Sequence, residues 1–410
     1  MTTGSYIQPL NPSDPATVFI SYARGDEDAI LPIERALQER GVRVRRDKPS
    51  LTLGAHTVHA LTGLINVGCD AILFYMTDKL LRSDFIWRHE IPTALARQKR
   101  EPNFHLIPVL LGVDYDELAL ICSDRGLPSL ADFNAERMDT GIVTPADVAR
   151  IARRTLRSTL VLRMARSEEE TIGLSLRTFA FTPPTPSIHL DLDWTTAFEG
   201  DGPTPEMWRT ALLPALADAT NALAQETHGR TVDCWLKARL PVGIALGYMI
   251  PPKGNLQLCL RNADTQWPCF GPGESADDLT VTSTALSGKT PCAIAEIAIS
   301  REMTKMVTAW REAEGVVPAW RVQFAPTNGP SRDALTSDGM ARAWARSIGN
   351  ELRRLWDGEG VRDIHLFLAS SIEFAVIVGQ QLRDRFPVHV YFANRDGQYQ
   401  RAYTLGEEQR

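Results

Sequence analysis

The sequence predicts an α/β protein with two parallel-sheet regions, and three observations support that fold class. β-prone apolar runs alternate with helical stretches over residues 17–170, which is typical of a parallel sheet covered by helices on both faces. A proline-rich segment at 178–187 then indicates a domain boundary. Beyond it, residues 232–267 correspond to residues 364–399 at a constant offset and without a gap. The second region therefore contains two similar α/β modules.

The composition is that of an ordinary globular protein with more than one domain. The chain has 410 residues, of which 44% are hydrophobic and 23% are charged, and this length exceeds what one core usually supports. Its net charge of −6 provides no general attraction for DNA or for anionic membranes. We therefore expect neither DNA nor a membrane as a partner.

The cysteines and the N-terminus indicate a cytoplasmic protein. The six cysteines are scattered and form no C-x-x-C pair, so we expect reduced thiols rather than disulfides. Residues 1–15 are polar and proline-rich and lack the apolar stretch of a signal peptide, so we expect a disordered tail there. No apolar run reaches the length of about 18 residues that a membrane helix needs.

The first region contains the strands and helices of one sheet in alternation. Strands are expected where β-prone residues gather, and helices where apolar and polar residues alternate with helical spacing. Gly41 is expected to end the first helix. The expected strands are 17–23, 41–47, 69–77 and 104–111, and the expected helices are 31–41, 55–66, a helix that begins near residue 88, and 144–170.

Glu90 is the carboxylate that this arrangement places at a candidate site. It follows the buried strand 69–77, and ligands of parallel sheets bind at the carboxyl ends of the strands. An isolated glutamate in a first helical turn is ordinarily solvated. Pro92, however, is tolerated only near a helix start, so the helix should begin at Arg88 or His89. Glu90 would then lie at the positive end of the helix dipole, which favours the ionised carboxylate.

Three segments of this region resemble the sequence boxes of TIR domains. VFISYARGDEDA resembles the first box, RRDKPSLTLG is similar to the BB loop, and SDFIWRHEIPTAL resembles the segment that carries the catalytic glutamate of NAD-cleaving members. The resemblance covers roughly residues 15–165 and implies a flavodoxin-like parallel sheet. The spacing from Trp87 to Glu90 is three rather than the commoner four, so Phe85 is an alternative for the aromatic wall of the pocket.

The resemblance implies roles for particular residues. Glu90 would be catalytic, and NAD+ would be bound by Ser21, Tyr22, Arg24, Phe85 and Trp87. The BB loop of one subunit would complete the site of the next, through Asp47, Lys48, Leu53 and Gly54. Such head-to-tail contacts do not close on themselves, so the resemblance also implies an open filament.

The chemistry of NAD+ cleavage requires little more than one carboxylate. Nicotinamide leaves as a neutral molecule from a cationic ring, so no general acid is needed, while the ribose becomes oxocarbenium-like. An ionised carboxylate beside that developing cation lowers the barrier. We expect no cofactor, because NAD+ is the substrate, and no metal. His56 and His59 are three residues apart but have no further ligand cluster, so a packed or solvated pair is the simpler interpretation.

The repeat in the second region relates residues that are 132 positions apart. Each copy is predicted to contain a strand, a loop, a helix, a second strand and a polar turn. A further strand precedes each copy, at 187–194 and at 293–300, followed by a helix at 205–226 and at 338–356. The matched residues include Leu236 with Leu368, Gly247 with Gly379, Asn262 with Asn394, Asp264 with Asp396 and Gln266 with Gln398.

This arrangement resembles the SAVED domain, a fusion of two CARF-like Rossmann-type modules. That family senses cyclic oligonucleotides in bacterial anti-phage signalling (CBASS). We expect a TIR domain at 16–168 and a SAVED domain at 169–410, with modules at about 180–280 and 285–410. Phosphates favour Arg, Lys and hydroxyl groups, and bases favour aromatic faces. The residues expected to bind the nucleotide are Lys237, Arg239, Trp267, Arg301, Ser370, Ser371, Arg395 and Tyr399.

The sequence as a whole predicts an NAD+ nucleosidase that a cyclic oligonucleotide activates. The favoured activator is a cyclic tri-adenylate-like molecule, whose binding would drive self-association into a filament and deplete NAD+. Two alternatives remain open. The chain could be a non-enzymatic TIR adaptor that nucleotide binding assembles, or a TIR cyclase that makes a cyclic ADP-ribose signal. The presence of Glu90 favours an enzyme over an adaptor.

Overall fold

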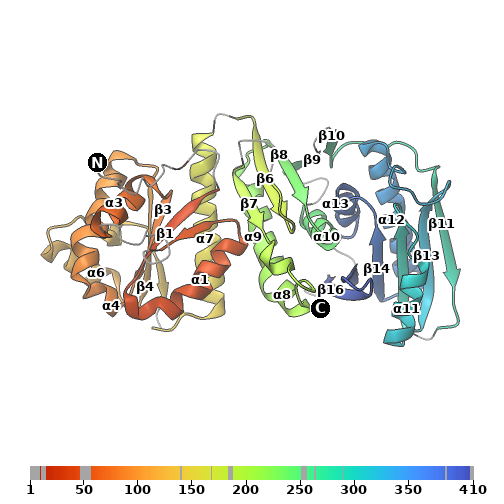
Figure 1. Cartoon of the computed structure of the whole chain (residues 1–410), viewed down its shortest axis with the longest axis horizontal. Coiled ribbons are helices and arrows are strands. Elements are labelled where there is room, and N and C mark those ends of the chain that lie inside the picture. Colours follow the sequence, from red (N-terminus) through yellow and green to blue (C-terminus); the bar gives the residue numbers. More distant parts are fainter. Residues whose placement is uncertain are drawn as a thin grey trace. The chain divides into compact units, whose positions relative to one another are not determined.

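The computed structural model describes residues 10, 15–46, 57–138, 141–167, 169–182, 188–250, 256–262, 265–288, 290–383 and 386–406. The chain divides into two compact units, one of Met1–Gly173 with Thr185–Leu192 and one of Leu174–Pro184 with Asp193–Arg410. Figure 1 shows sheets with helices packed beside them in both units. The expected fold class, an N-terminal parallel sheet followed by Rossmann-type modules, is confirmed.

The first sheet is entirely parallel, with the strand order β2-β1-β3-β4-β5. This is the flavodoxin-like order. Its strands are β1 (Thr17–Ser21), β2 (Arg43–Arg45), β3 (Ala71–Met76), β4 (His105–Leu111) and β5 (Glu136–Met138). Its helices are α1 (Glu27–Glu39), α3 (Thr57–Val67), α4 (Asp78–Leu81), α5 (Ile91–Arg100), α6 (Tyr115–Asp124) and α7 (Pro145–Arg166).

Local sequence explains most of these boundaries. Gly41 follows α1 with a positive φ of 78°, as expected of a residue that ends a helix. Thr144 and Asp147 form a reciprocal capping box at the start of α7, because each side chain bonds the backbone N–H of the other. Helix α6 and strand β5 were not predicted from the sequence. β5 has three residues, too few for a strand periodicity to be visible.

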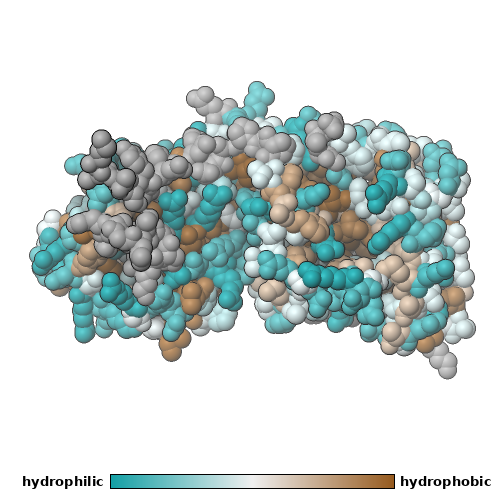
Figure 2. Space-filling model, viewed as in Figure 1, coloured by the Kyte–Doolittle hydropathy of each residue, from teal (hydrophilic) through white to brown (hydrophobic). Residues whose placement is uncertain are grey.

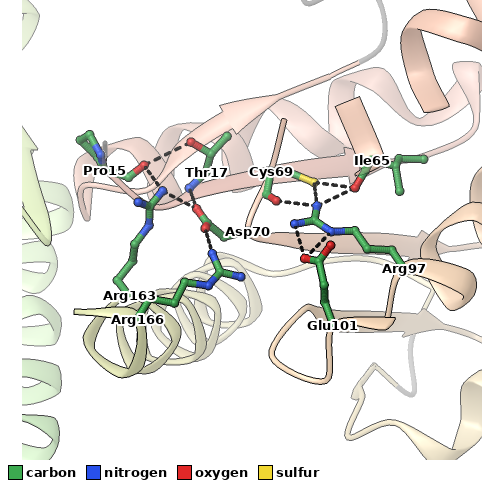
Figure 3. Close-up of polar contacts among 9 residues, drawn as sticks. All are labelled: Pro15, Thr17, Ile65, Cys69, Asp70, Arg97, Glu101, Arg163 and Arg166. Carbon is green, nitrogen blue, oxygen red and sulfur yellow. Dashed lines mark hydrogen bonds and ion pairs between the residues drawn. The ribbon is translucent and has the colours of Figure 1, made fainter. Parts of the chain in front are cut away.

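A buried ion-pair cluster joins α7 to the amino ends of β1 and β3 (Figure 3). The carboxylate of Asp70 is fully buried. Its Oδ2 accepts hydrogen bonds from the backbone N–H of Thr17 at 2.8 Å and from the Arg163 guanidinium at 2.7 Å. Its Oδ1 accepts one from Arg166 at 2.7 Å. A buried ion pair is strongly destabilised when one partner is removed, because the other charge is then buried without a counter-ion.

We therefore expect Asp70→Asn to destabilise the first unit by about 3–5 kcal/mol, because the substitution leaves the Arg163 guanidinium buried without its counter-ion. The matched control is Asp78→Asn, since the Asp78–Arg82 pair is exposed and its atoms are 3.7 Å apart. Exposed pairs contribute roughly 0–1 kcal/mol. Urea unfolding of both variants measures the difference, and equal unfolding midpoints would contradict the prediction.

Two further sheets follow in the chain. One has the order β10-β9-β8-β6-β7 and the other the order β11-β13-β12-β14-β15-β16. The strands of the first are β6 (Thr171–Arg177), β7 (Leu190–Asp193), β8 (Thr231–Lys237), β9 (Gln257–Asn262) and β10 (Thr265–Pro268). Those of the second are β11 (Leu279–Ala285), β12 (Thr290–Ala298), β13 (Pro318–Pro326), β14 (Asp363–Ala369), β15 (Val388–Ala393) and β16 (Tyr399–Leu405). The helices are α8 (Pro205–Met207), α9 (Leu213–Glu226), α10 (Leu240–Met249), α11 (Thr304–Glu314), α12 (Asp338–Gly358) and α13 (Ile372–Gln381).

The two sheets have the same topology. The orders β7-β6-β8-β9-β10 and β13-β12-β14-β15-β16 correspond strand for strand, and β11 is an addition at one edge. The sequence repeat paired the strand at 293–300, which is β12, with the strand at 187–194, which is β7, and this pairing was wrong. The sheet order instead makes β6 the counterpart of β12, because both lie beside the repeated strands β8 and β14. β7 corresponds to β13.

Helices α10 and α13 pack with their backbones in contact, at glycines of the repeat. A Cβ at Gly247 would lie 1.8 Å from the carbonyl oxygen of Val376, and one at Gly379 would lie 2.2 Å from that of Ile244. These contacts are related by the same offset of 132 residues. A Cβ at Gly243 would lie 2.7 Å from Ile372, the first residue of α13. Because successive turns of one helix meet successive turns of the other, α10 and α13 run parallel and start at the same end.

Candidate functional site

Glu90 lies in a π-helical segment, Ile86–Glu90, directly before α5, and is 5% exposed. The predicted helix start was wrong, because helical structure already begins at Asp84. Pro92 is tolerated there because the π-turn shifts the hydrogen-bond register, with the N–H of Ile91 donating to the carbonyl oxygen of Ile86. Glu90 is therefore the seventh residue of the helical stretch, and the dipole of its first turn does not reach it.

The two expected aromatic residues have different environments. Trp87 is 3% exposed, and its indole N–H donates to the carbonyl oxygen of Leu81 at 3.0 Å. The Arg125 guanidinium covers its ring at 4.8 Å, and Trp87 belongs to a hydrophobic core cluster of this unit. Phe85 is 37% exposed and packs against the His89 ring at 4.9 Å. Of the two, Phe85 is the aromatic ring that a ligand can reach.

The residues after β1 lie at the carboxyl edge of the first sheet. Ser21 ends β1 and is 1% exposed, and its hydroxyl has no hydrogen-bond partner within the described parts of the chain. The Tyr22 hydroxyl accepts a hydrogen bond from Arg46 at 3.3 Å. Arg24 is exposed in a 3-10 turn. The expected BB-loop residues all lie outside the described residues, and they are Asp47, Lys48, Leu53 and Gly54.

A polar cluster that the sequence analysis missed ties the ends of β1 and β3 together. Asp26 is buried and accepts hydrogen bonds from the Thr77 hydroxyl at 2.6 Å and from the Lys79 ammonium at 2.7 Å. Arg46 forms an ion pair with Glu34 at 2.9 Å, next to Tyr22. The acidic end of the first TIR-like box was the available signal for Asp26. This cluster holds the turn that carries Arg24 against the segment that leads to Glu90.

At the carboxyl edge of the second sheet, the loops after β6 and β8 meet. The N–H of Arg239, the residue before α10, donates to the Thr178 hydroxyl at 3.0 Å, and its guanidinium lies 5.0 Å from the centre of the Phe179 ring. The carbonyl oxygen of Lys237 accepts from the N–H of Thr178 at 3.0 Å. The Lys237 side chain is exposed. Two basic side chains therefore stand at the start of α10.

The corresponding edge of the third sheet carries hydroxyl groups and one arginine. Ser371 caps α13, because its hydroxyl accepts a hydrogen bond from the N–H of Phe374 at 3.3 Å. The Ser370 hydroxyl donates to the carbonyl oxygen of Ser371 at 2.8 Å. The N–H groups of Ile299 and Ser300 both donate to the carbonyl oxygen of Ala369, so the exposed Arg301 follows a segment held beside the end of β14.

Because α10 and α13 run parallel, both sets of residues lie at one end of the helix pair. Aligned helix N-termini carry partial positive charge and free N–H groups, which favour anions. Figure 2 shows hydrophobic residues on the second unit, where Figure 1 labels α10 and α13, and hydrophilic residues around them. The arrangement can bind an anion that also presents apolar or aromatic surface.

The remaining expected nucleotide residues are less clearly grouped. Tyr399 is 8% exposed, and its pKa is raised to about 12 by burial, with the charge of Arg301 opposing the shift. Arg395 is exposed in the turn between β15 and β16, which Asn394 and Gln398 close by hydrogen bonds. Trp267 is half-buried in β10 opposite Leu260. The charge of Arg301 thus acts on Tyr399, so these two expected residues lie near each other.

The third sheet also borders an aromatic cavity that the sequence analysis missed. It has a volume of about 520 Å³, and of the expected residues Tyr399 alone lines it. The His365 Nδ1 lies 2.9 Å from the Tyr391 hydroxyl. Burial, followed by the charges of His389 and Arg401, lowers the pKa of His365 to about 4, so this ring is neutral at pH 7. The aromatic and charged lining residues are Trp310, Glu314, His365, Tyr391, Tyr399, Arg401 and Asp201.

The described residues present no metal-binding cluster and no membrane-spanning helix. No group of three or more His, Cys, Asp or Glu side chains in the described parts of the chain is arranged to hold a metal ion. None of the helices built from described residues combines the length and the apolar character that crossing a membrane requires.

Two family models match the chain, one in each region. The TIR domain family matches residues 18–140. The family described as the "SMODS-associated and fused to various effectors sensor domain" (SAVED) matches residues 215–405. No curated protein matches the chain.

Two solved structures share the fold, both of the Acinetobacter baumannii Cap4 SAVED/CARF-domain containing receptor. The one with the cyclic trinucleotide 3'3'3'-cAAA has a TM-score of 0.50 and 14% sequence identity. The one with 2'3'3'-cAAA has a TM-score of 0.50 and 15% identity. Each comparison covers 82% of this chain and 87% of the other. At this identity the likeness concerns the fold alone.

Proposed function

Since the chain joins a TIR domain to a SAVED domain, we propose that it is a cytoplasmic NAD+ glycohydrolase that a cyclic oligonucleotide activates in bacterial anti-phage defence. A cyclic tri-adenylate is the proposed activator. The Cap4 receptor of similar fold was solved with cyclic trinucleotides, which supports this choice of ligand class. NAD+ is the substrate, and its loss would arrest the infected cell.

The observation that supports NAD+ cleavage by this chain is the burial of Glu90. Glu90 is 5% exposed in the segment that follows β3 and α4, and the Phe85 side chain, on the same helical stretch, is 37% exposed. An ionised carboxylate in a site of low polarity stabilises a developing oxocarbenium ion more strongly than it would in water. Ser21 offers a buried hydroxyl at the end of β1, suited to a hydrogen bond with a ribose or phosphate oxygen.

The observation that supports the sensor half is the parallel pair of helix starts. α10 and α13 direct their N-termini to one end of the second unit, where Lys237 and Arg239 add two positive charges and Ser371 adds a hydroxyl. Phosphate groups of a cyclic oligonucleotide fit this combination. The aromatic cavity beside Tyr399 has room for a base.

Activation by assembly would connect the two halves. We propose that the bound nucleotide promotes head-to-tail stacking, so that the BB loop of one subunit completes the NAD+ site of the next. Shifting a protein from about 1% to about 99% of the active form requires roughly 5.5 kcal/mol of differential binding. A charged ligand that also forms part of a subunit interface can supply energy on this scale.

The test is NAD+ consumption by the purified full chain, with and without a panel of cyclic di-, tri- and tetranucleotides. We expect nicotinamide release only with a cyclic tri-adenylate. Arg239→Glu should raise the nucleotide concentration for half-activation at least about tenfold, which corresponds to about 1.4 kcal/mol. The matched control is Arg362→Glu, an exposed residue that precedes β14 at the opposite edge of its sheet. It should leave activation unchanged.

Three outcomes would contradict parts of the proposal. If the nucleotide binds and assembles the protein while NAD+ stays intact, the chain is an adaptor. If NAD+ is consumed without any nucleotide, the sensor half fails. If cyclic ADP-ribose accumulates in place of ADP-ribose, the enzyme is a cyclase, and mass spectrometry of the products distinguishes the two.

A further inference from the structure

The aromatic cavity beside the third sheet lies on the face that α11 covers. Trp310 of α11 packs against His365 and Phe367 of β14, with ring centroids 5.2 and 4.8 Å apart. Helix α11 joins β12 to β13 and α13 joins β14 to β15, so these two connections cross the sheet in opposite directions. Connections between parallel strands are right-handed, so the two helices cover opposite faces. The cavity is therefore on the face away from α13.

The cavity also extends to the edge of the sheet opposite to the helix starts. Tyr399 lies at its near end and pairs with Ala393, the last residue of β15. Glu314, the last residue of α11, lines the far end with Val316 and His365. Helix α11 returns from the carboxyl edge to the amino edge, so these three residues lie at the amino edge. None of the residues proposed to hold phosphate at the starts of α10 and α13 is among the described residues that line it.

Aromatic rings give the cavity flat walls that are already in place. Trp310, Tyr391 and Tyr399 line it, and each is less than 10% exposed. Trp310 and Tyr391 have ring centroids 4.7 Å apart, and Phe367 supports Tyr391 from behind by stacking at 4.6 Å. Nucleobases stack on such faces. The volume of about 520 Å³ falls within the range of about 300–1,000 Å³ for sites of single small molecules.

Polar groups around these rings match a ribose and one phosphate. Asp201 and Glu314 provide two exposed carboxylates, which accept hydrogen bonds from ribose hydroxyls. Arg401 is exposed opposite Tyr391, and a guanidinium group suits a phosphate. The Nδ1 of the neutral His365 bonds with the Tyr391 hydroxyl, which leaves Nε2 for a base. Two carboxylates beside one arginine disfavour a ligand with several phosphates, because like charges repel.

Both modules of the second unit contribute to the cavity. The loop 201–205, which follows β7 of the first module, lines one side of it. The Gln400 side chain of β16 donates to the carbonyl oxygen of Asp201 at 2.9 Å, which holds this loop against the third sheet. Gly202 has a positive φ of 85°, and a Cβ there would lie 3.5 Å from the Phe392 ring. A ligand in the cavity therefore contacts both modules at once.

We propose that this cavity is a second ligand site, which binds a single ribonucleotide with one phosphate, such as adenosine 5′-monophosphate (AMP). The base stacks on the aromatic walls, the ribose hydroxyls donate to Asp201 and Glu314, and the phosphate pairs with Arg401. The site is separate from the helix starts and from Glu90, so it requires neither the cyclic oligonucleotide nor NAD+ cleavage. Its occupant stabilises the contact between the two modules.

The test is calorimetric titration of the full chain with AMP and with adenosine, which has no phosphate. We expect saturable binding of one AMP per chain. Arg401→Gln should raise the dissociation constant for AMP at least about tenfold and leave that for adenosine unchanged. The matched control is Arg346→Gln, which removes the same charge from an exposed position on α12 and should affect neither ligand.

A second pair of variants tests the ribose. Glu314→Gln should weaken AMP and adenosine alike, at least about tenfold, because a hydrogen bond to a charged acceptor is lost. Glu312→Gln, on the same helix and also exposed, should change neither affinity. All four substituted side chains lie at partly or fully exposed positions, so the fold is retained.

Three results would overturn the proposal. A full chain that does not bind AMP has no such site. An Arg401→Gln variant that weakens AMP and adenosine equally would show that the phosphate lies elsewhere. Displacement of AMP by cyclic tri-adenylate would show that the cavity belongs to the site of the cyclic nucleotide, whereas an unchanged AMP affinity in its presence is the expected result.

Discussion

Replacing Glu90 by glutamine is expected to lower NAD+ cleavage by about 10²- to 10³-fold, the range seen when one group that stabilises a transition state is removed. Glutamine keeps the shape of the side chain and its capacity to hydrogen-bond, but loses the negative charge that the oxocarbenium-like ribose requires. Because Glu90 is nearly buried, water cannot replace that charge. The measurement is nicotinamide release at saturating cyclic tri-adenylate.

The control for this experiment is Asp84→Asn, on the same helical stretch. Asp84 is exposed and forms an ion pair with Arg88 at 3.6 Å, so its loss should leave cleavage unchanged. Glu90→Gln protein should still bind the nucleotide and assemble, which separates loss of chemistry from loss of activation. Full activity of Glu90→Gln would show that this carboxylate is a structural residue of the helix.

Substituting alanine for Gly247 is expected to have the second large effect. Its Cβ would lie 1.8 Å from the carbonyl oxygen of Val376, so α10 and α13 must separate, at a cost of about 3 kcal/mol. Separation would also move the two helix starts that are proposed to bind phosphate, so nucleotide affinity should fall. Thermal unfolding and nucleotide titration of the same protein measure both effects.

The repeat supplies a second variant, and α12 supplies the control. Gly379→Ala meets Ile244 in the equivalent contact and should act like Gly247→Ala. The double variant should cost less than the sum of the two, because the helices need to separate only once. Gly358, the last residue of α12, has nothing within 4 Å of a Cβ, so Gly358→Ala should be neutral or slightly stabilising. Additive effects would indicate two independent local strains.

The sequence predicted best where a periodic pattern extends over many residues. The buried strand β3 and the capped helix α7 have such patterns, and so does the repeat that contains α10 and α13. The helix start at Glu90 was predicted wrongly, because the rule for proline assumes regular α-helical bonding, and a π-turn removes that restriction. A second π-turn, Trp208–Leu212, likewise precedes Pro214, so the chain uses the same solution twice.

The site residues that the sequence analysis missed depend on distant contacts. Asp26 became recognisable as part of a cluster only when β1 and β3 were adjacent, which brings Thr77 and Lys79 to it. The rings of the aromatic cavity come from α11, β14, β15 and β16, and no local spacing relates them. Trp87 was expected to bind NAD+ because it is close to Glu90 in sequence, but its side chain lies in a hydrophobic core cluster.

The offset of 132 residues also relates residues that differ. Lys237 corresponds to Ala369, and Arg239 corresponds to Ser371. A dimer of identical modules would offer a ligand two equivalent orientations, whereas a fused pair with unlike side chains offers one. The backbone of this unit is thus nearly symmetric, whereas its side chains are not. One module contributes basic residues and the other contributes hydroxyl groups at or beside the equivalent positions. A cyclic ligand bound as proposed would therefore have one preferred orientation, and the subunit contacts that it helps to form would be directional, as a head-to-tail interface requires.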